Sequence, residues 1–288
     1  MMSTISPSRE YCGCACLMLA LMCTSGAVYA QNENSLFAAS TDSSLLFNDG
    51  RDAALQQGAT PVRAPGLGAV FKEMPRDLWR FLSVDTAIVL GAGGAAAGIA
   101  HIWDDDLKQE VETSVRLNDA LEPGNSYGAF SSQVAIGIGM YGVGWLAKAP
   151  PLAVAGADIM RAQFVSQMWV QALKFTTQRT RPDGSDDLSF PSGHSASAFA
   201  TATVLQRHFG WKAGVPAYLL AGYVSTARVH DNRHYLSDVV FGAAMGIAGE
   251  RTVMRSGRYV VRLAPGAGPQ TASLTVVLSP PLRSHPDN

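Results

Sequence analysis

The sequence contains no cysteine after Cys23. All four of its cysteines, Cys12, Cys14, Cys16 and Cys23, lie near the start of a chain of 288 residues. The chain beyond them can therefore form neither a disulfide nor a metal site with cysteine ligands. A segment without thiols suits an oxidising compartment.

An excess of charge of either sign is also missing. The chain has 22 Lys and Arg against 23 Asp and Glu, a formal net charge of -1. Proteins that bind nucleic acid usually carry a basic excess, so we expect no nucleic-acid partner. Asp104, Asp105 and Asp106 are interpreted as a solvated helix start and not as a metal site. We expect neither a metal nor a cofactor.

Long uninterrupted apolar runs are scarce. A membrane-spanning helix needs about 20 mostly apolar residues, and the stretch 86–102, which comes nearest, consists largely of Gly and Ala. Gln163 and Gln167 interrupt a later apolar run, and the mean hydropathy is +0.09. These features favour a soluble or peripherally membrane-bound protein over an integral one. The oligomeric state is not indicated.

The first thirty residues have the pattern of a signal peptide. An apolar stretch over 14–23 precedes Val28-Tyr29-Ala30, which fits cleavage after Ala30. A lipoprotein with Cys23 as the lipidated residue is the alternative. We therefore expect residues 1–30 to direct export, with a periplasmic location, and residues 31–70 to form a poorly ordered N-terminal arm.

Helical signals dominate the remainder. Pro75 is expected at the first position of a helix, and a charged helix is predicted from Asp104 to about Leu121, ended by Pro123-Gly124. Further helices are predicted over 129–147, 152–180, 193–208, 213–228 and 235–254.

Strand-like alternation occurs only around 259–263 and 273–278, and it favours a small C-terminal β-hairpin. The predicted fold is all-α, a bundle of about six core helices in a domain over residues 71–256. A C-terminal extension over 257–288 would follow it.

Three clusters of residues carry chemistry. In the first, Lys174 and Arg181 are seven residues apart, which on a helix would place two cations on one face, as a phosphate requires. In the second, Ser192 and Gly193 precede a helix whose free amides can bind an anion, with His194 at its rim. Each also fits a blander interpretation, a solvated basic face or an ordinary capped helix.

The third cluster contains Arg228, His234 and Asp238. On a helix, residues four apart are neighbours, so the Asp238 carboxylate would stand beside the His234 imidazole. A carboxylate on one ring nitrogen fixes the tautomer and leaves the other nitrogen free to attack. His230 is interpreted as a loop or rim residue.

Together, the three clusters match in order the pattern K-x6-R-P, P-S-G-H and S-R-x5-H-x3-D over residues 174–238. In this the chain resembles the type 2 phosphatidic acid phosphatase superfamily, with the bacterial class A acid phosphatases and the vanadium haloperoxidases. One departure is Ala227, where the family has Ser. The charge and the nucleophile of the motif are kept.

The resemblance implies a helical bundle of the acid phosphatase/vanadium haloperoxidase type and a metal-independent phosphatase without a cofactor. His234 would form a phospho-histidine, Asp238 would orient it, and His194 would protonate the leaving oxygen. The groups that bind the non-bridging oxygens would be cations and backbone amides, at Lys174, Arg181, Arg228, Ser192 and Gly193.

The expected substrate is a phosphorylated small molecule or a lipid phosphate or pyrophosphate, and the apolar helices favour a lipid-like one. The sequence leaves membrane association open. Two alternatives remain. One is a vanadium-dependent haloperoxidase, in which His234 would be a vanadate ligand, although such chains are usually much longer. The other is a non-catalytic, membrane-associated helical protein that keeps the pocket as a relic.

Overall fold

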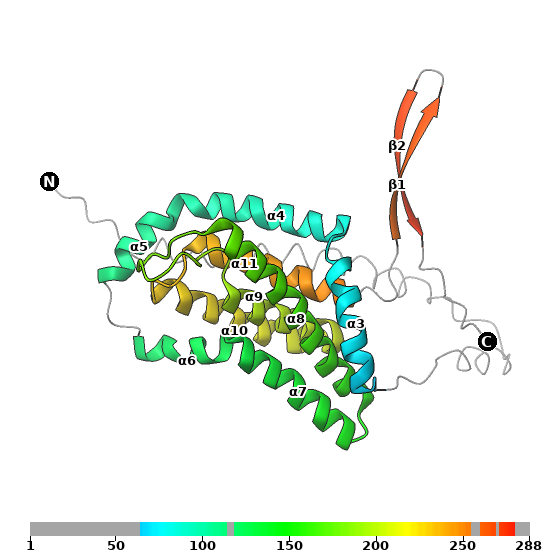
Figure 1. Cartoon of the computed structure of the whole chain (residues 1–288), viewed down its shortest axis with the longest axis horizontal. Helices are drawn as coiled ribbons and strands as arrows, with labels where there is room; N and C mark the ends of the chain where they lie inside the picture. Colours follow the sequence, from blue (N-terminus) through cyan, green and yellow to red (C-terminus); the bar gives the residue numbers. More distant parts are fainter. Residues whose placement is uncertain (1–63, 114–117, 255–259, 269–270, 280–288) are drawn as a thin grey trace, which may run out of the picture.

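The computed structural model describes residues 64–113, 118–254, 260–268 and 271–279 (Figure 1). In these ranges the helices are α3 (Leu67–Arg80), α4 (Val84–Ala100), the 3-10 turn η2 (His101–Trp103), α5 (Asp104–Thr113), α6 (Asn118–Gly128), α7 (Phe130–Leu146), α8 (Pro150–Thr177), α9 (Gly193–Phe209), α10 (Trp211–His230) and α11 (Leu236–Val253). The predicted all-α bundle is confirmed. The expected signal peptide and most of the expected N-terminal arm, residues 1–63, lie outside the described residues.

Two strands form the hairpin that was expected near the C-terminus. Strand β1 (Val260–Gly268) pairs antiparallel with β2 (Thr271–Ser279), so that Val260 lies opposite Ser279. Strand β1 is longer than the alternation around 259–263 indicated, because it continues to Gly268.

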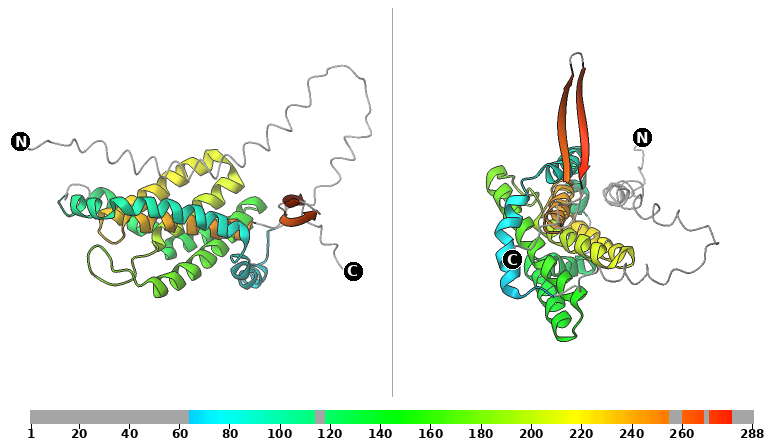
Figure 2. Two further views of the ribbon diagram at one scale, coloured as in Figure 1. Left: turned by 90° about the horizontal axis from the view of Figure 1, so that it is seen from above. Right: turned by 90° about the vertical axis from the view of Figure 1, so that its right-hand side faces the viewer.

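Helices α8, α9 and α11 form the centre of the bundle. Buried side chains from all three make one apolar cluster that includes Ile159, Val204 and Met245, while Phe199 and Tyr218 belong to a second cluster between α9 and α10. Helix α4 packs on α11 and α7 packs on α8, and they lie on opposite sides of the bundle in Figure 1. Figure 2 shows α4 running along the length of the central helices.

Small residues allow the helices to approach closely. A Cβ atom on Gly246 of α11 would lie 2.2 Å from the backbone oxygen of Ala196 in α9. A Cβ atom on Gly93 of α4 would lie 2.2 Å from the Cβ of Ala244 in α11. Both distances are far below van der Waals contact, so larger residues would separate the helices that carry the site.

Five predicted helices, from 129–147 to 235–254, agree with α7–α11 to within three residues at each end. Two boundaries nearer the N-terminus were wrong. Helix α3 begins at Leu67, and Pro75 lies inside it. Pro123 and Gly124 do not end a helix but lie within α6.

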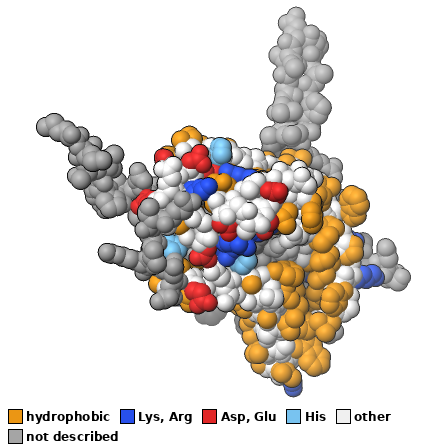
Figure 3. All heavy atoms as spheres, turned by 60° about the vertical axis from the view of Figure 1, so that its left-hand side comes forward, with side chains coloured by type: hydrophobic (Ala, Val, Ile, Leu, Met, Phe, Trp, Pro, Cys, Tyr) orange, Lys and Arg blue, Asp and Glu red, His pale blue; other side chains and the backbone are white. Residues whose placement is uncertain are grey.

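The outer helices expose many large apolar side chains. Those more than half exposed include Trp79, Ile88, Ile138, Trp145 and Leu219. In Figure 3, hydrophobic side chains gather over one part of the visible face, apart from the area where charged and histidine side chains gather. Among the described residues, one continuous helical stretch, Val84–Val111, is long and apolar enough to cross a membrane by length and composition.

Four helix ends meet at one end of the bundle. The amide of Ser192, just before α9, donates to the backbone oxygen of Asp238 in α11 at 3.0 Å. The amide of His234, just before α11, donates to the backbone oxygen of Arg228 in the last turn of α10 at 3.2 Å. These bonds join the second and third clusters, and a bond from Nη1 of Arg181 to the backbone oxygen of Arg233 at 3.3 Å adds the first.

Candidate active site

The first cluster keeps its two cations together, although not on one helix. Helix α8 ends at Thr177, and Gln178 adopts a left-handed conformation with φ of 45°, so Arg181 lies in the loop beyond. The expectation that Lys174 and Arg181 share a helix face was therefore wrong. The Arg181 charge nevertheless acts on Lys174: burial and then this charge lower the pKa of Lys174 to about 8.

Both of these cations are held by groups of the loop that follows α8. The buried Lys174 ammonium donates to the backbone oxygen of Leu188. Arg181 donates through Nε to Oδ1 of Asp186 at 2.6 Å and through Nη1 to the backbone oxygen of Arg233 at 3.3 Å. Asp186 and Leu188 of this loop thus hold one cation each, and Asp183 pairs with Arg233 at 2.9 Å.

The third cation, Arg228, is buried and is held by α6. Its Nη1 donates to Oδ1 of Asn125 at 2.5 Å, and Nδ2 of Asn125 donates to Asp231 at 2.6 Å. The pKa of Arg228 is lowered to about 10, chiefly by burial, so the guanidinium stays charged at neutral pH. Nothing in the sequence motif indicated Asn125, because it lies 103 residues away.

The second cluster starts α9 as predicted. The Ser192 hydroxyl caps the helix by accepting from the amide of Ser195 at 3.4 Å. The Ser192 amide, predicted to bind an anion, is instead engaged by Asp238. Within the described ranges the amides of Gly193 and His194 donate to no protein group. An anion at this helix end would therefore meet the amides of Gly193 and His194, with the Ser192 hydroxyl nearby.

The third cluster differs from the prediction in how His234 is held. His234 precedes α11, and its Nδ1 lies 3.7 Å from Oδ2 of Asp238, beyond hydrogen-bonding distance. Nδ1 instead lies 2.7 Å from the backbone oxygen of Ser189. A carbonyl oxygen only accepts, so Nδ1 carries the proton and Nε2 keeps its lone pair.

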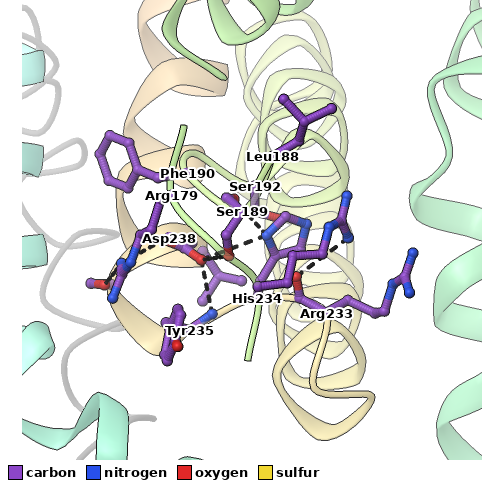
Figure 4. A network of polar contacts seen from close by, with 12 residues as sticks. Arg179, Leu188, Ser189, Phe190, Ser192, Arg233, His234, Tyr235 and Asp238 are labelled. Carbon is purple, nitrogen blue, oxygen red and sulfur yellow. Dashed lines mark hydrogen bonds and ion pairs between the residues drawn. The ribbon is translucent and has the colours of Figure 1, made fainter. Parts of the chain in front are cut away.

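Asp238 reaches His234 indirectly. Its Oδ2 accepts from the Ser189 hydroxyl and, at 2.9 Å, from the amide of Tyr235, the residue that follows His234. Its Oδ1 accepts from Nη1 of Arg179 at 2.7 Å. Figure 4 shows Asp238 between Arg179 on one side and Ser189 and His234 on the other. The carboxylate therefore holds the residues on either side of the imidazole.

The charges of the site act on both histidines. Burial and then the charges of Arg228, His234, Lys174 and Arg181, in that order, together lower the pKa of His194 to about 3. Burial likewise lowers the pKa of His234 to about 4, with the nearby Asp238 carboxylate acting against it and the Lys174 charge in the same direction. Both imidazoles are thus neutral at neutral pH in a cationic site.

Sequence reasoning missed several residues behind the site. Arg179 lies two residues before Arg181. The one signal for it in the sequence is that the segment 174–181 contains a third cation besides Lys174 and Arg181. Asp104 cannot be told from Asp105 and Asp106 by sequence, yet it is 3% exposed. The interpretation of Asp104 as part of a solvated helix start was wrong.

His230 was also misjudged. Expected at a rim, it ends α10 with a buried ring, and neither ring nitrogen has a hydrogen-bond partner among the described residues.

Comparison with known proteins agrees with the motifs. Residues 155–262 match the model of the PAP2 superfamily, which confirms the resemblance stated above. A lipid A 1-phosphatase of Porphyromonas gingivalis is 43% identical over 81 residues, which are 27% of this chain and 18% of that protein. The chain therefore matches less than a fifth of the length of that relative.

Among solved structures, the crystal structure of a transmembrane PAP2 type phosphatidylglycerolphosphate phosphatase from Bacillus subtilis covers 65% of this chain and 94% of its own, with a TM-score of 0.43 and 20% identity.

Proposed function

We propose, from the premise that residues 155–262 match the PAP2 superfamily, that this chain is a phosphatase that acts through a phospho-histidine at His234. The observation that carries the proposal is the state of that side chain. Nδ1 is committed to the Ser189 carbonyl at 2.7 Å, so Nε2 is the nucleophilic nitrogen.

The first step is in-line attack of the Nε2 lone pair on phosphorus. The P–N bond forms as the ester P–O bond breaks, and the leaving oxygen takes a proton from His194, which the bound phosphate holds in its imidazolium form. In the second step His194 removes a proton from water, the water oxygen attacks phosphorus, and the P–N bond breaks. Phosphate leaves and both imidazoles return to their first states.

Charge stabilisation comes from side chains and amides. Lys174, Arg181 and Arg228 face the non-bridging oxygens, together with the amides of Gly193 and His194. Fixed cations at those oxygens are the main catalytic term in phosphoryl transfer. This cationic set supports a reaction that needs no metal, and full activity in EDTA is the expected result.

The proposed substrate is a lipid phosphate or pyrophosphate. One support is the set of large apolar side chains exposed on the outer helices, because such side chains favour contact with lipid. The other is the similarity to a lipid A 1-phosphatase. We also propose that residues 1–30 direct export, so that the site acts outside the cytoplasm.

The experiment compares three substrates on one preparation: phosphatidic acid, a polyprenyl pyrophosphate and p-nitrophenyl phosphate, each with and without EDTA. We expect the highest kcat/KM on a lipid substrate. A preparation that binds phosphate but hydrolyses none of the three would overturn the proposal in favour of a non-catalytic protein. Vanadate-dependent halide oxidation would overturn it in favour of a haloperoxidase.

A further inference from the structure

Asp104 is a buried carboxylate at the end of an apolar helix. It begins α5, directly after α4 and η2, and is 3% exposed, whereas its neighbours Asp105 and Asp106 are exposed. A buried carboxylate is costly unless cations and hydrogen bonds compensate it. Apart from His101, three positions earlier in the chain, the residues that compensate Asp104 lie at or beside the candidate active site.

These contacts occupy both oxygens of Asp104. Oδ1 accepts from the amide of Ser237 at 3.0 Å, and Oδ2 accepts from the Ser237 hydroxyl at 2.6 Å. Oδ2 also lies 2.8 Å from Nη2 of Arg179 and 2.7 Å from Nδ1 of His101. Ser237 immediately precedes Asp238, so Asp104 holds the first turn of α11.

Arg179 links the two buried carboxylates. One arm of its guanidinium reaches Asp104, and the other reaches Oδ1 of Asp238 at 2.7 Å. The plane is further held over the ring of Tyr235, at 4.1 Å from the ring centroid. Because the guanidinium is flat and its arms diverge at a fixed angle, its position determines how Asp238 is turned.

Asp238 in turn sets the nucleophile. With Oδ1 held by Arg179, Oδ2 faces the Ser189 hydroxyl and the Tyr235 amide. These contacts fix the Ser189 carbonyl, which is the acceptor for Nδ1 of His234. Among the described residues, the Ser189 carbonyl is the one group within hydrogen-bonding distance of Nδ1. A shift of Asp238 would therefore move this carbonyl and with it the His234 ring.

We infer that Asp104 and Arg179 are positioning residues for His234, and that they act through Asp238 and Ser189. Because Asp104 directly follows α4 and η2, the position of the His234 ring then depends on how α4 packs against the bundle. This inference rests on the proposed function. Neither residue is proposed to touch the substrate. The same helical stretch that exposes apolar side chains to its surroundings supplies the carboxylate that fixes the catalytic turn.

The test uses Asp104→Asn, which places an amide against the Arg179 guanidinium, with Asp105→Asn as the matched control one residue away. The full chain is assayed on p-nitrophenyl phosphate. We expect Asp104→Asn to lower kcat by about 10- to 100-fold, with KM within about threefold of the parent, because misplacement of a reacting group by about 1 Å has effects of that size. Asp105→Asn should match the parent.

A second variant separates positioning from folding. Arg179→Met removes the cation beside Asp238, so the carboxylate favours the protonated imidazole more strongly and the acid limb of the pH–rate profile should move to higher pH. Arg179→Lys keeps the charge without the fork, and it should lower kcat while leaving that limb in place. Circular dichroism and thermal unfolding establish which variants are folded.

The outcomes are distinguishable. A folded Asp104→Asn protein with the kcat of Asp105→Asn would overturn the inference while the phosphatase proposal stands. If Asp104→Asn does not fold, Arg179→Lys decides: parental kcat overturns the inference, and a loss at parental KM supports it. Lack of activity in the parent itself would overturn the phosphatase proposal, and the inference with it.

Discussion

The backbone oxygen of Ser189 lies 2.7 Å from Nδ1 of His234, whereas the nearest Asp238 oxygen to that nitrogen is 3.7 Å away. The tautomer of the candidate nucleophile is thus set by a main-chain group, which no substitution of a side chain removes. The carboxylate has a supporting task, because it holds the loop that carries this carbonyl.

The first prediction concerns the nucleophile. His234→Ala should lower kcat on p-nitrophenyl phosphate by at least about 1000-fold, because the covalent intermediate can no longer form. Substrate carrying labelled phosphate, quenched in alkali, should label the parent protein and not the variant. His208→Gln is the control. His208 lies in the last turn of α9, at the opposite end of that helix from His194, and its Nε2 is 2.9 Å from Asp158 of α8. Equal labelling of His234→Ala and the parent would exclude His234 as the phosphorylated residue.

The second prediction concerns pH. The pKa of His234 is lowered to about 4 by burial, and the nucleophile must be unprotonated, so kcat/KM should fall as the pH drops through about 4. His194 must be protonated once substrate is bound. An adjacent phosphate favours the imidazolium and raises its pKa from about 3, so kcat should fall as the pH rises through that higher value. Rates from pH 3 to 8 should be bell-shaped with an acid optimum, and a flat profile would contradict the two-histidine scheme.

The third prediction concerns the support of Arg228. Asn125→Ala removes the 2.5 Å hydrogen bond that holds this guanidinium, and we expect a loss of about tenfold in kcat/KM, the usual scale for a hydrogen bond to a charged group. Ser126→Ala, at an exposed neighbouring position of α6, should have no effect. If both variants match the parent in steady-state kinetics, Asn125 does not support Arg228 in catalysis.

The fourth prediction concerns helix packing. Gly246→Ala would place a Cβ 2.2 Å from the Ala196 oxygen, and we expect destabilisation of about 1–3 kcal/mol from overpacking between α9 and α11. A Cβ at Gly222 of α10 meets no atom within 4 Å. Gly222→Ala should therefore leave stability unchanged or raise it by up to about 1 kcal/mol. Thermal unfolding compares the two, and equal melting temperatures would show that the helices separate without cost.

The fifth prediction concerns lipid contact. Ile88 on α4 and Ile138 on α7 are 65% and 55% exposed, and replacing both with Asn should weaken sedimentation with phosphatidylcholine vesicles by more than about tenfold. Turnover of p-nitrophenyl phosphate should be unchanged, because neither residue lies near the site. Glu122→Gln, exposed on α6, is the control. Unchanged vesicle binding by the double variant would remove these helices from the proposed lipid surface.

The helical fold could be predicted from local patterns, because apolar periodicity indicates α7–α11. The convergence of Lys174, His194 and His234 in one site could be expected only from the resemblance to a known family, whose three motifs the chain matches in order. The path of the chain between these residues could not be predicted. Arg181 lies beyond the end of α8 because Gln178 turns the chain out of the helix.

Residues that support the site from distant parts of the sequence could not be predicted either. Asp104 is separated from Ser237 by 133 positions, and nothing local distinguishes a carboxylate that will be buried from two that stay in water. Pro75 and Pro123 misled for the opposite reason, because tertiary packing keeps helices intact where local propensity would end them.

The bonds that Arg181 makes to Asp186 and Arg233 have a consequence for turnover. A guanidinium that is already immobilised loses little conformational entropy when it binds an anion. It should therefore bind any tetrahedral oxyanion of suitable charge. The held guanidinium favours binding of free phosphate, the product, as much as binding of the phosphate group of the substrate. We therefore expect competitive inhibition by inorganic phosphate, with discrimination among substrates left to the part of the molecule that carries the leaving group.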